Sequence, residues 1–399
     1  MNVEPAQDPP MQDLPAQDLP AQDLSEQGLP EQRLLMLRAP SANRVYAAAS
    51  APLALREAER VLGAHLGVPV TARVREIAGV EHLELCGRAP REAMVRVAST
   101  LSSAMALFAP ADLAGRELLE PVALADVCRH PSDLETTLRY PGKTNEQFTA
   151  LLINLASAAS EGRAGLLDGS LALLDPMCGR GTTLSRALRL GLSPVGADVD
   201  KADHDAYRAF LTTWMRTHRL KHTSASTRLT VDGRVLGSRF DAELARDKAA
   251  QRAGEVQTLS LLRCDAGELA RVLGRGRTDV IVTDLPYGVQ HGSHGPDSLD
   301  RSPLAVLSRV LPVWRELLRR DGAMALAINR RTAPFDQAVA RLADAGFTTV
   351  SADGEFRHRV DQSIDRDVLV AVRTDHPRAA ELREESERAA ARPSERIAP

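Results

Sequence analysis

Short apolar runs that alternate with helical segments constrain the fold of this chain more than any other feature of its sequence. From about Tyr140 onward the runs lie at residues 171–175, 194–198, 259–264, 279–283 and 323–329. Continuous runs of this length are typical of parallel strands that are buried on both faces. Helical patterns separate them, at residues 144–160, 182–190, 202–219, 303–320 and 334–345. The alternation predicts a doubly wound, Rossmann-like α/β sheet, and residues 356–360 and 367–372 predict an antiparallel hairpin that closes it.

A different pattern precedes this sheet. Residues 34–130 predict strands at 44–49, 70–76, 80–86 and 104–108 and helices at 52–63 and 90–103. The order strand-helix-strand-strand-helix-strand is that of a small ferredoxin-like α+β domain. We therefore expect two domains, 34–130 and 140–372, which suits a chain of 399 residues.

The two ends of the chain have a biased composition. Residues 1–33 repeat a five-residue unit with proline and carry seven acidic residues against one basic residue, which predicts a disordered acidic arm. Residues 373–399, rich in Ala, Arg, Glu and Pro, predict a disordered tail. The part between them has a formal charge of +3, which permits a nucleic-acid partner without requiring one.

Composition also excludes several protein classes. No run reaches the roughly 18 to 20 apolar residues that a membrane span needs, and the N-terminus lacks the pattern of a secretory signal. The four cysteines are far apart, which excludes a zinc ribbon and argues against a disulfide framework. We expect a cytoplasmic protein with no membrane partner and no metal site.

A glycine-bearing loop follows the first run of the parallel pattern. The sequence LLDPMCGRGTT spans residues 173–183, so a strand that ends at Asp175 leads through Gly179 and Gly181 into a helix. Glycines let the backbone approach a ligand closely, and a helix N-terminus offers unpaired N–H groups. Asp198, at the end of the next strand, is placed to accept hydrogen bonds from ribose hydroxyls. The pattern predicts a nucleoside-cofactor site; the structural alternative is a tight turn with a surface acid.

A second motif, TDLPYG at residues 283–288, directly follows the predicted strand 279–283. Asp284 and a backbone carbonyl can both accept hydrogen bonds from an exocyclic amine, and Tyr287 offers a flat face on which a base can stack. The alternative interpretation is a proline turn at a strand end.

Together these motifs resemble those of class I S-adenosylmethionine-dependent methyltransferases, in the amine-methylating group that carries a D/N-P-P-Y/F motif. DPMCGRGT followed about 100 residues later by DLPYG is similar to the RNA methylase family that includes the THUMP-linked tRNA guanine-N2 methyltransferases. The resemblance covers residues 140–372. It implies an S-adenosylmethionine-dependent RNA methyltransferase that acts on a base amine, with guanine N2 in tRNA as the expected target.

The resemblance also implies a role for each matching residue. The expected catalytic residues, which hold the target amine and its base, are Asp284, Pro286 and Tyr287. Asp198 is expected to bind the ribose and Asp265 to lie near the adenine amino group. The expected neighbours of the methionine end are Asp175, Gly179 and Gly181, with Cys178 packing in the same cofactor-binding loop. Residues 143–148 are a further candidate for the methionine side, and a helix start capped by Thr144 is the structural alternative.

The chain departs from the family pattern at several places. Leu285 replaces the first proline of the common motif, and Arg186 stands where related enzymes often have Glu. No THUMP domain is recognised ahead of the methyltransferase region, so an accessory protein is expected to help dock the substrate. His291 and His294 are assigned to a target-binding loop rather than to a metal site.

Basic residues between 206 and 240 suggest either a phosphate-binding stripe or a solvated helix face. They are Arg208, Arg216, Arg219, Lys221, Arg228, Arg234 and Arg239.

Other functions are compatible with parts of the pattern. A DNA adenine-N6 or cytosine-N4 methyltransferase uses the same motif chemistry, and ribosomal RNA is a second RNA target. A non-catalytic cofactor-binding module would keep the fold without the activity. An NAD-dependent oxidoreductase would not need DLPYG.

Overall fold

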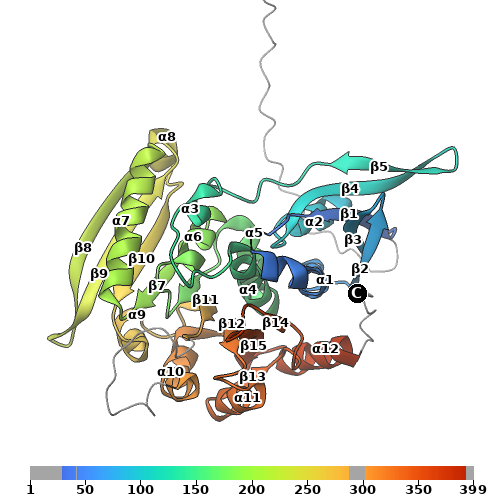
Figure 1. Ribbon diagram of the computed structural model, residues 1–399. Helices are drawn as coiled ribbons and strands as arrows, with labels where there is room; N and C mark the ends of the chain where they lie inside the picture. Colours follow the sequence, from blue (N-terminus) through green and yellow to red (C-terminus); the bar gives the residue numbers. More distant parts are fainter. Residues whose placement is uncertain (1–28, 42, 287–301, 392–399) are drawn as a thin grey trace, which may run out of the picture.

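The computed structural model describes residues 29–41, 43–286 and 302–391. Figure 1 shows two β-sheets, a smaller one formed by the N-terminal residues and a larger one formed by the rest of the chain. None of the helices in these described ranges is long and apolar enough to span a membrane.

The N-terminal unit is a five-stranded antiparallel sheet with two helices. Its strands lie in the order β2-β3-β1-β4-β5. Its elements are β1 (Gln32–Arg38), α1 (Arg44–Leu66), β2 (Val70–Ile77), β3 (Val80–Gly87), α2 (Arg91–Ala98), β4 (Ala104–Leu113) and β5 (Arg116–Val122). The elements from β1 to β4 run strand-helix-strand-strand-helix-strand; the ferredoxin-like assignment stays a prediction. The hairpin of β4 and β5 projects beyond the rest of the unit (Figure 1).

Three local predictions for this unit were wrong. Residues 44–49 are the first turns of α1 rather than a strand, because the Asn43 side chain accepts hydrogen bonds from the N–H groups of Val45 (3.0 Å) and Tyr46 (3.1 Å). The first strand is instead β1, which begins inside the stretch assigned to the acidic arm. Strand β5 was missed because its turn, Ala114 and Gly115, needs a positive φ at both residues, and Ala is an uncommon choice there.

The larger sheet has ten strands, nine of them in the order β13-β15-β12-β11-β6-β7-β10-β9-β8. The parallel strands at its centre match the five predicted runs: β6 (Leu173–Asp175), β7 (Val195–Asp198), β10 (Gln257–Arg263), β11 (Thr278–Asp284) and β12 (Leu318–Asn329). Antiparallel strands extend both sides: β8 (Lys221–Val231), β9 (Arg234–Ala245), β13 (Phe347–Thr349), β14 (His358–Arg359) and β15 (Asp365–Arg373). The predicted α/β class is confirmed.

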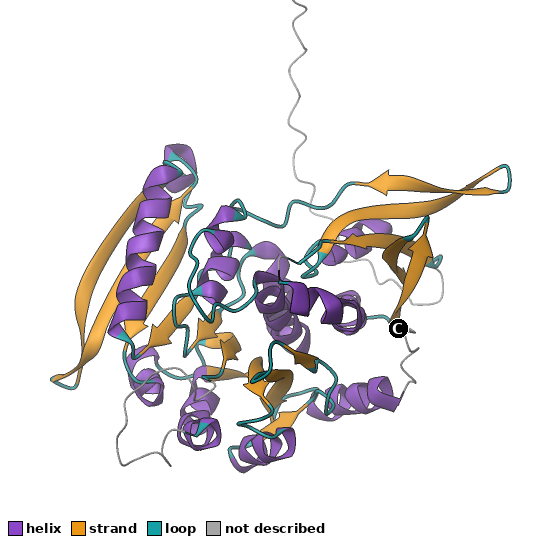
Figure 2. Cartoon of the chain, in the orientation of Figure 1, coloured by secondary structure: helices purple, strands orange, loops and turns teal. Residues whose placement is uncertain are grey.

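Helices cover both faces of this sheet (Figure 2). Val280 and Val282 of β11 pack on one face, in a core that includes residues of α4 (Glu146–Ala159) and α6 (Thr182–Arg189). Ile281 packs on the other face, with residues of α10 (Pro303–Leu317) and α11 (Phe335–Asp344). Alternate side chains of one strand therefore enter different cores, which explains the continuous apolar runs. Burial of each of these side chains stabilises the fold by about 1.5–3 kcal/mol.

The remaining helices complete the fold. They are α3 (Asp133–Thr136), α5 (Gly165–Asp168), α7 (Lys201–Thr217), α8 (Lys248–Arg252), α9 (Leu269–Leu273) and α12 (Ala379–Ala391), with short 3₁₀ turns at Glu161–Ala164 and Ala266–Glu268. Trp214 and Trp314 are buried, as expected for core residues.

Two further predictions differ from the structure. The basic residues after Thr217 do not continue a helix: Arg219 has a positive φ, and Lys221, Arg228, Arg234 and Arg239 lie on the β8–β9 hairpin. Helix α12 occupies part of the segment that was assigned to a disordered tail, and its Leu382 is buried in the core that contains α4. One buried leucine in a helix of mostly alanine and charged residues is a weak sequence signal, which explains the error.

Candidate functional site

Four aspartates gather at one edge of the larger sheet. Asp175, Asp198 and Asp284 are the last residues of β6, β7 and β11, and Asp265 follows β10. These strands are parallel, and β6 pairs with both β7 and β11, so their carboxyl ends face the same side. This edge is where ligands bind in open α/β sheets.

The loop after β6 is held close to β7 by backbone hydrogen bonds. The N–H of Cys178 donates to the carbonyl of Ala197 (2.9 Å), and the N–H of Gly181 donates to the carbonyl of Cys178 (2.8 Å). Gly181 caps α6 with a φ of +73°, and a Cβ there would lie 2.6 Å from the Tyr207 ring. Gly181 is therefore required by packing against Tyr207.

Gly179 has a different environment from Gly181. An added Cβ at Gly179 would meet no neighbour closer than a carboxylate oxygen of Asp203, at 3.9 Å. The backbone at Gly179, with a φ of +48°, therefore faces open space that a ligand can approach. Cys178 is buried and packs with Leu184 and Tyr207 in the core beside α7, in agreement with its assignment to loop packing.

Two carboxylates orient this loop, that of the buried Asp175 and that of the half-buried Asp198. Asp198 accepts hydrogen bonds from the N–H groups of Gly179 (2.8 Å) and Asp200 (2.9 Å), one on each oxygen. Asp175 accepts from the N–H of Met177 (3.1 Å). Burial raises the pKa of both groups, and that of Asp175 reaches about 7. A carboxylate has about four acceptor positions, so Asp198 retains capacity for a pair of hydroxyl donors.

Asp265 is engaged by its neighbours. Its side chain accepts a hydrogen bond from the N–H of Gly267 (2.7 Å) and forms an ion pair with Arg309 of α10. Burial acts to raise its pKa, but the hydrogen bonds and the charge of Arg309 outweigh burial and lower it. An adenine amino group bound to Asp265, as the sequence analysis expects, would share this carboxylate with Arg309.

Asp284 is held by two side chains that the sequence analysis did not connect with it. The Thr144 hydroxyl donates a hydrogen bond to Oδ2 of Asp284 (2.7 Å). The guanidinium of Arg366, on β15, donates to the same oxygen (3.2 Å). Next to it, Leu285 is buried and its N–H donates to the carbonyl of Ala327 (3.0 Å), whereas Pro286 is exposed. Tyr287, His291 and His294 lie outside the described residues.

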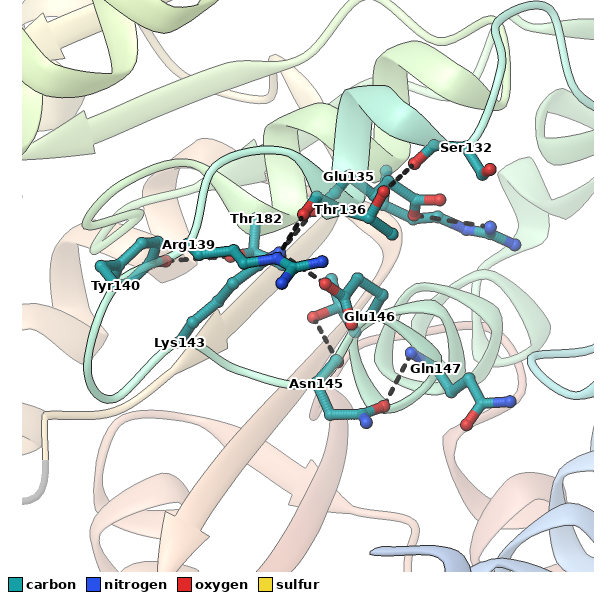
Figure 3. Close-up of polar contacts among 12 residues, drawn as sticks. Ser132, Glu135, Thr136, Arg139, Tyr140, Lys143, Asn145, Glu146, Gln147 and Thr182 are labelled. Carbon is teal, nitrogen blue, oxygen red and sulfur yellow. Dashed lines mark hydrogen bonds and ion pairs between the residues drawn. The ribbon is translucent and has the colours of Figure 1, made fainter. Parts of the chain in front are cut away.

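In the segment between α3 and α4, Tyr140 lies beside Thr182, the first residue of α6 (Figure 3). The hydroxyls of Tyr140 and Thr182 are hydrogen-bonded at 3.0 Å, and the Arg180 guanidinium lies 5.0 Å from the centre of the Tyr140 ring. Lys143 donates to the carbonyl of Glu135 and pairs with Glu146. Tyr140 therefore contacts the start of α6 and Arg180 of the loop, whereas Lys143 is tied to α3 and α4.

The cap of α4 is Asn145, not Thr144. Asn145 accepts from the N–H groups of Gln147 (2.8 Å) and Phe148 (3.1 Å), which leaves the Thr144 hydroxyl for Asp284. Arg186, the departure noted in α6, pairs with the buried Glu135. Within the residues that the structure describes, no group of three His, Cys, Asp or Glu side chains is placed to hold a metal ion.

Part of the chain matches a protein-family model. Residues 141–337 match the UPF0020 family, described as RMKL-like, methyltransferase domain. No curated protein matches the chain.

Solved structures that resemble the chain are distant. A TehB-like SAM-dependent methyltransferase from Corynebacterium glutamicum is 17% identical, with 57% of this chain and 97% of that chain covered and a TM-score of 0.29. The Burkholderia thailandensis 1,6-didemethyltoxoflavin-N1-methyltransferase, solved with S-adenosylhomocysteine, is 18% identical, with 68% and 97% covered and a TM-score of 0.32. TM-scores this low carry no argument about function.

Proposed function

We propose that residues 141–337, which match the UPF0020 model, form a methyltransferase domain that transfers a methyl group from S-adenosylmethionine to an exocyclic amine of an RNA base, guanine N2 in tRNA. The observation that carries this proposal is the position of Asp284. Its carboxylate ends β11, which pairs directly with β6, the strand that leads into the glycine loop. A hydrogen-bond acceptor for an amine and a loop suited to a nucleoside cofactor therefore meet at one edge.

The residues of the loop fit S-adenosylmethionine. The open face of Gly179 allows the methionine end to approach the backbone, and Asp198 has acceptor capacity for the two ribose hydroxyls. Asp265 would lie near the adenine amino group, while Asp175, Cys178 and Gly181 keep the loop in shape. When bound, the cofactor supplies an electrophilic methyl group on a sulfonium centre.

On the acceptor side, Asp284 would bind the amine. Hydrogen bonding to its carboxylate and to the following backbone carbonyl favours a pyramidal nitrogen whose lone pair is available for attack. Asp284 would also stabilise the positive charge that develops on the nitrogen as the N–C bond forms, until the nitrogen releases its proton to solvent. Pro286 and Tyr287 complete the motif, with Tyr287 as the face for the base. Because in-line attack on a methyl group depends mainly on alignment, orientation supplies much of the rate.

RNA is favoured over DNA by the form of the motif, since the DLPYG sequence resembles that of tRNA guanine-N2 methyltransferases. The N-terminal unit, with its projecting β4–β5 hairpin, is a candidate for docking the RNA, with or without an accessory protein.

The test is methyl transfer from labelled S-adenosylmethionine to undermethylated tRNA, ribosomal RNA and genomic DNA, followed by digestion to nucleosides and chromatography. The proposal predicts N2-methylguanosine from tRNA. Label in ribosomal RNA alone would move the target to rRNA, and label on adenine N6 or cytosine N4 of DNA would replace the RNA assignment. Cofactor binding without label in any of the three would refute a nucleic-acid substrate.

A further inference from the structure

Asp284 is restrained by two elements that lie far from it in the sequence. The Thr144 hydroxyl and the Arg366 guanidinium both reach its Oδ2 atom, at 2.7 and 3.2 Å. Thr144 directly precedes Asn145, the cap of α4, and Arg366 lies on β15, which pairs with β12 beside β11. Contacts on one oxygen from two directions restrict the rotation of the carboxylate.

The Arg366 side chain is itself held in place. It is only 6% exposed, and its guanidinium lies 4.7 Å from the centre of the Phe148 ring on α4. Phe148 contacts His358, whose ring centre is 4.9 Å away and which pairs with Arg366 in the β14–β15 register. Tyr46 of α1 packs edgewise on both rings, at 6.3 and 5.6 Å. We call Phe148, His358 and Tyr46 the aromatic support of Arg366.

A buried guanidinium is costly unless it is paired, and replacing a buried ion pair with apolar side chains is often neutral or stabilising. Stability alone therefore does not account for an arginine at this place. Its partner is the one carboxylate of the DLPYG motif, and one ring of its aromatic support comes from the N-terminal unit. This combination indicates a role in the reaction.

We propose that Arg366 and Thr144 are positioning residues, which fix the orientation of the Asp284 carboxylate before the amine arrives. The inference rests on the proposed function. Neither residue needs to touch the substrate: both act through Asp284. A preorganised acceptor avoids reorientation during the reaction, and a misplacement of about 1 Å can lower a rate by about 10²-fold.

The test compares matched substitutions. Thr144→Val removes the hydroxyl and keeps the shape of the side chain, whereas Thr144→Ser keeps the hydroxyl. Thr144→Val is expected to lower kcat about tenfold, with an unchanged KM for S-adenosylmethionine and an unchanged Tm, and Thr144→Ser is expected to restore turnover. Arg366→Gln is expected to lower kcat about 10²-fold, and Arg359→Gln, the same change at an exposed site on β14, is expected to have no effect. Wild-type turnover in both Thr144→Val and Arg366→Gln would overturn the proposal, as would a loss that Thr144→Ser shares.

A second readout does not depend on activity. An arginine in a buried ion pair rotates slowly about its Nε–Cζ bond, so its Nη groups give separate NMR signals. We expect such signals for Arg366, assigned by their absence in Arg366→Gln, and their collapse in Asp284→Asn. Averaged signals in the wild type would refute the restraint. A wild type that methylates no RNA but shows these signals would refute the proposed function and leave the restraint intact.

Discussion

The loop after β6 and the motif after β11 lie at the same edge of the sheet but are held in different ways. The glycine loop is shaped by contacts over short stretches of chain: Asp198 binds the N–H of Gly179, 19 residues away. Asp284 is held by side chains that lie 140 and 82 residues away, Thr144 and Arg366. The cofactor side therefore depends on local sequence, whereas the acceptor side depends on the packing of α4 and β15 against the sheet.

The largest expected effect is on the acceptor side. Asp284→Ala is expected to lower methyl transfer by about 10²–10⁴-fold, because it removes the acceptor that orients the amine. Single-turnover transfer with saturating cofactor measures this. Transfer within a few-fold of wild type would show that Asp284 does not bind the amine.

Adding a side chain at Gly181, in the glycine loop, is expected to destabilise the fold. Gly181→Ala adds a Cβ that would lie 2.6 Å from the Tyr207 ring at a φ of +73°, so we expect a loss of about 2–4 kcal/mol in the free energy of unfolding. Gly233→Ala, in the β8–β9 turn, has a similar φ of +76° but no neighbour within 4 Å, and is expected to lose about 1 kcal/mol. Urea unfolding compares the two. Equal losses would show that contact with Tyr207 does not restrict this position.

The glycine loop and the motif around Asp284 also show how far the sequence could predict the site. The glycine loop, the acids at the strand ends and the parallel strands were all found because each is a local pattern of strand, turn and helix. Thr144 was interpreted as a helix cap, and Arg366 was not singled out, since a contact with Asp284 requires knowledge of which strands pair. Arg44 to Ala49 was assigned to a strand because the Asn43 cap was overlooked. Helix α12 and the β8–β9 hairpin were missed because their sequences are mostly polar.

A further expected effect is a dependence of stability on pH. Burial raises the pKa of Asp175 from 3.8 to about 7, so between these values the folded protein binds a proton that the unfolded chain has lost. Stability is then reduced as the pH rises from about 4 to 7, by at most about 1.4 kcal/mol per pH unit, and levels off above. Asp175→Asn should remove this contribution. Urea unfolding at pH 5 and pH 8 tests it, and an identical pH dependence in both proteins would contradict the assignment.

The most direct test of the division between the two sides is a titration of S-adenosylmethionine into the wild type, Asp198→Ala and Asp284→Ala by calorimetry. The account predicts that Asp198→Ala weakens binding about tenfold or more, because the ribose hydroxyls and the N–H of Gly179 lose their acceptor. It predicts an affinity for Asp284→Ala within about threefold of wild type, in a folded protein whose methyl transfer is lowered about 10²–10⁴-fold. Loss of binding in Asp284→Ala with normal binding in Asp198→Ala would contradict it.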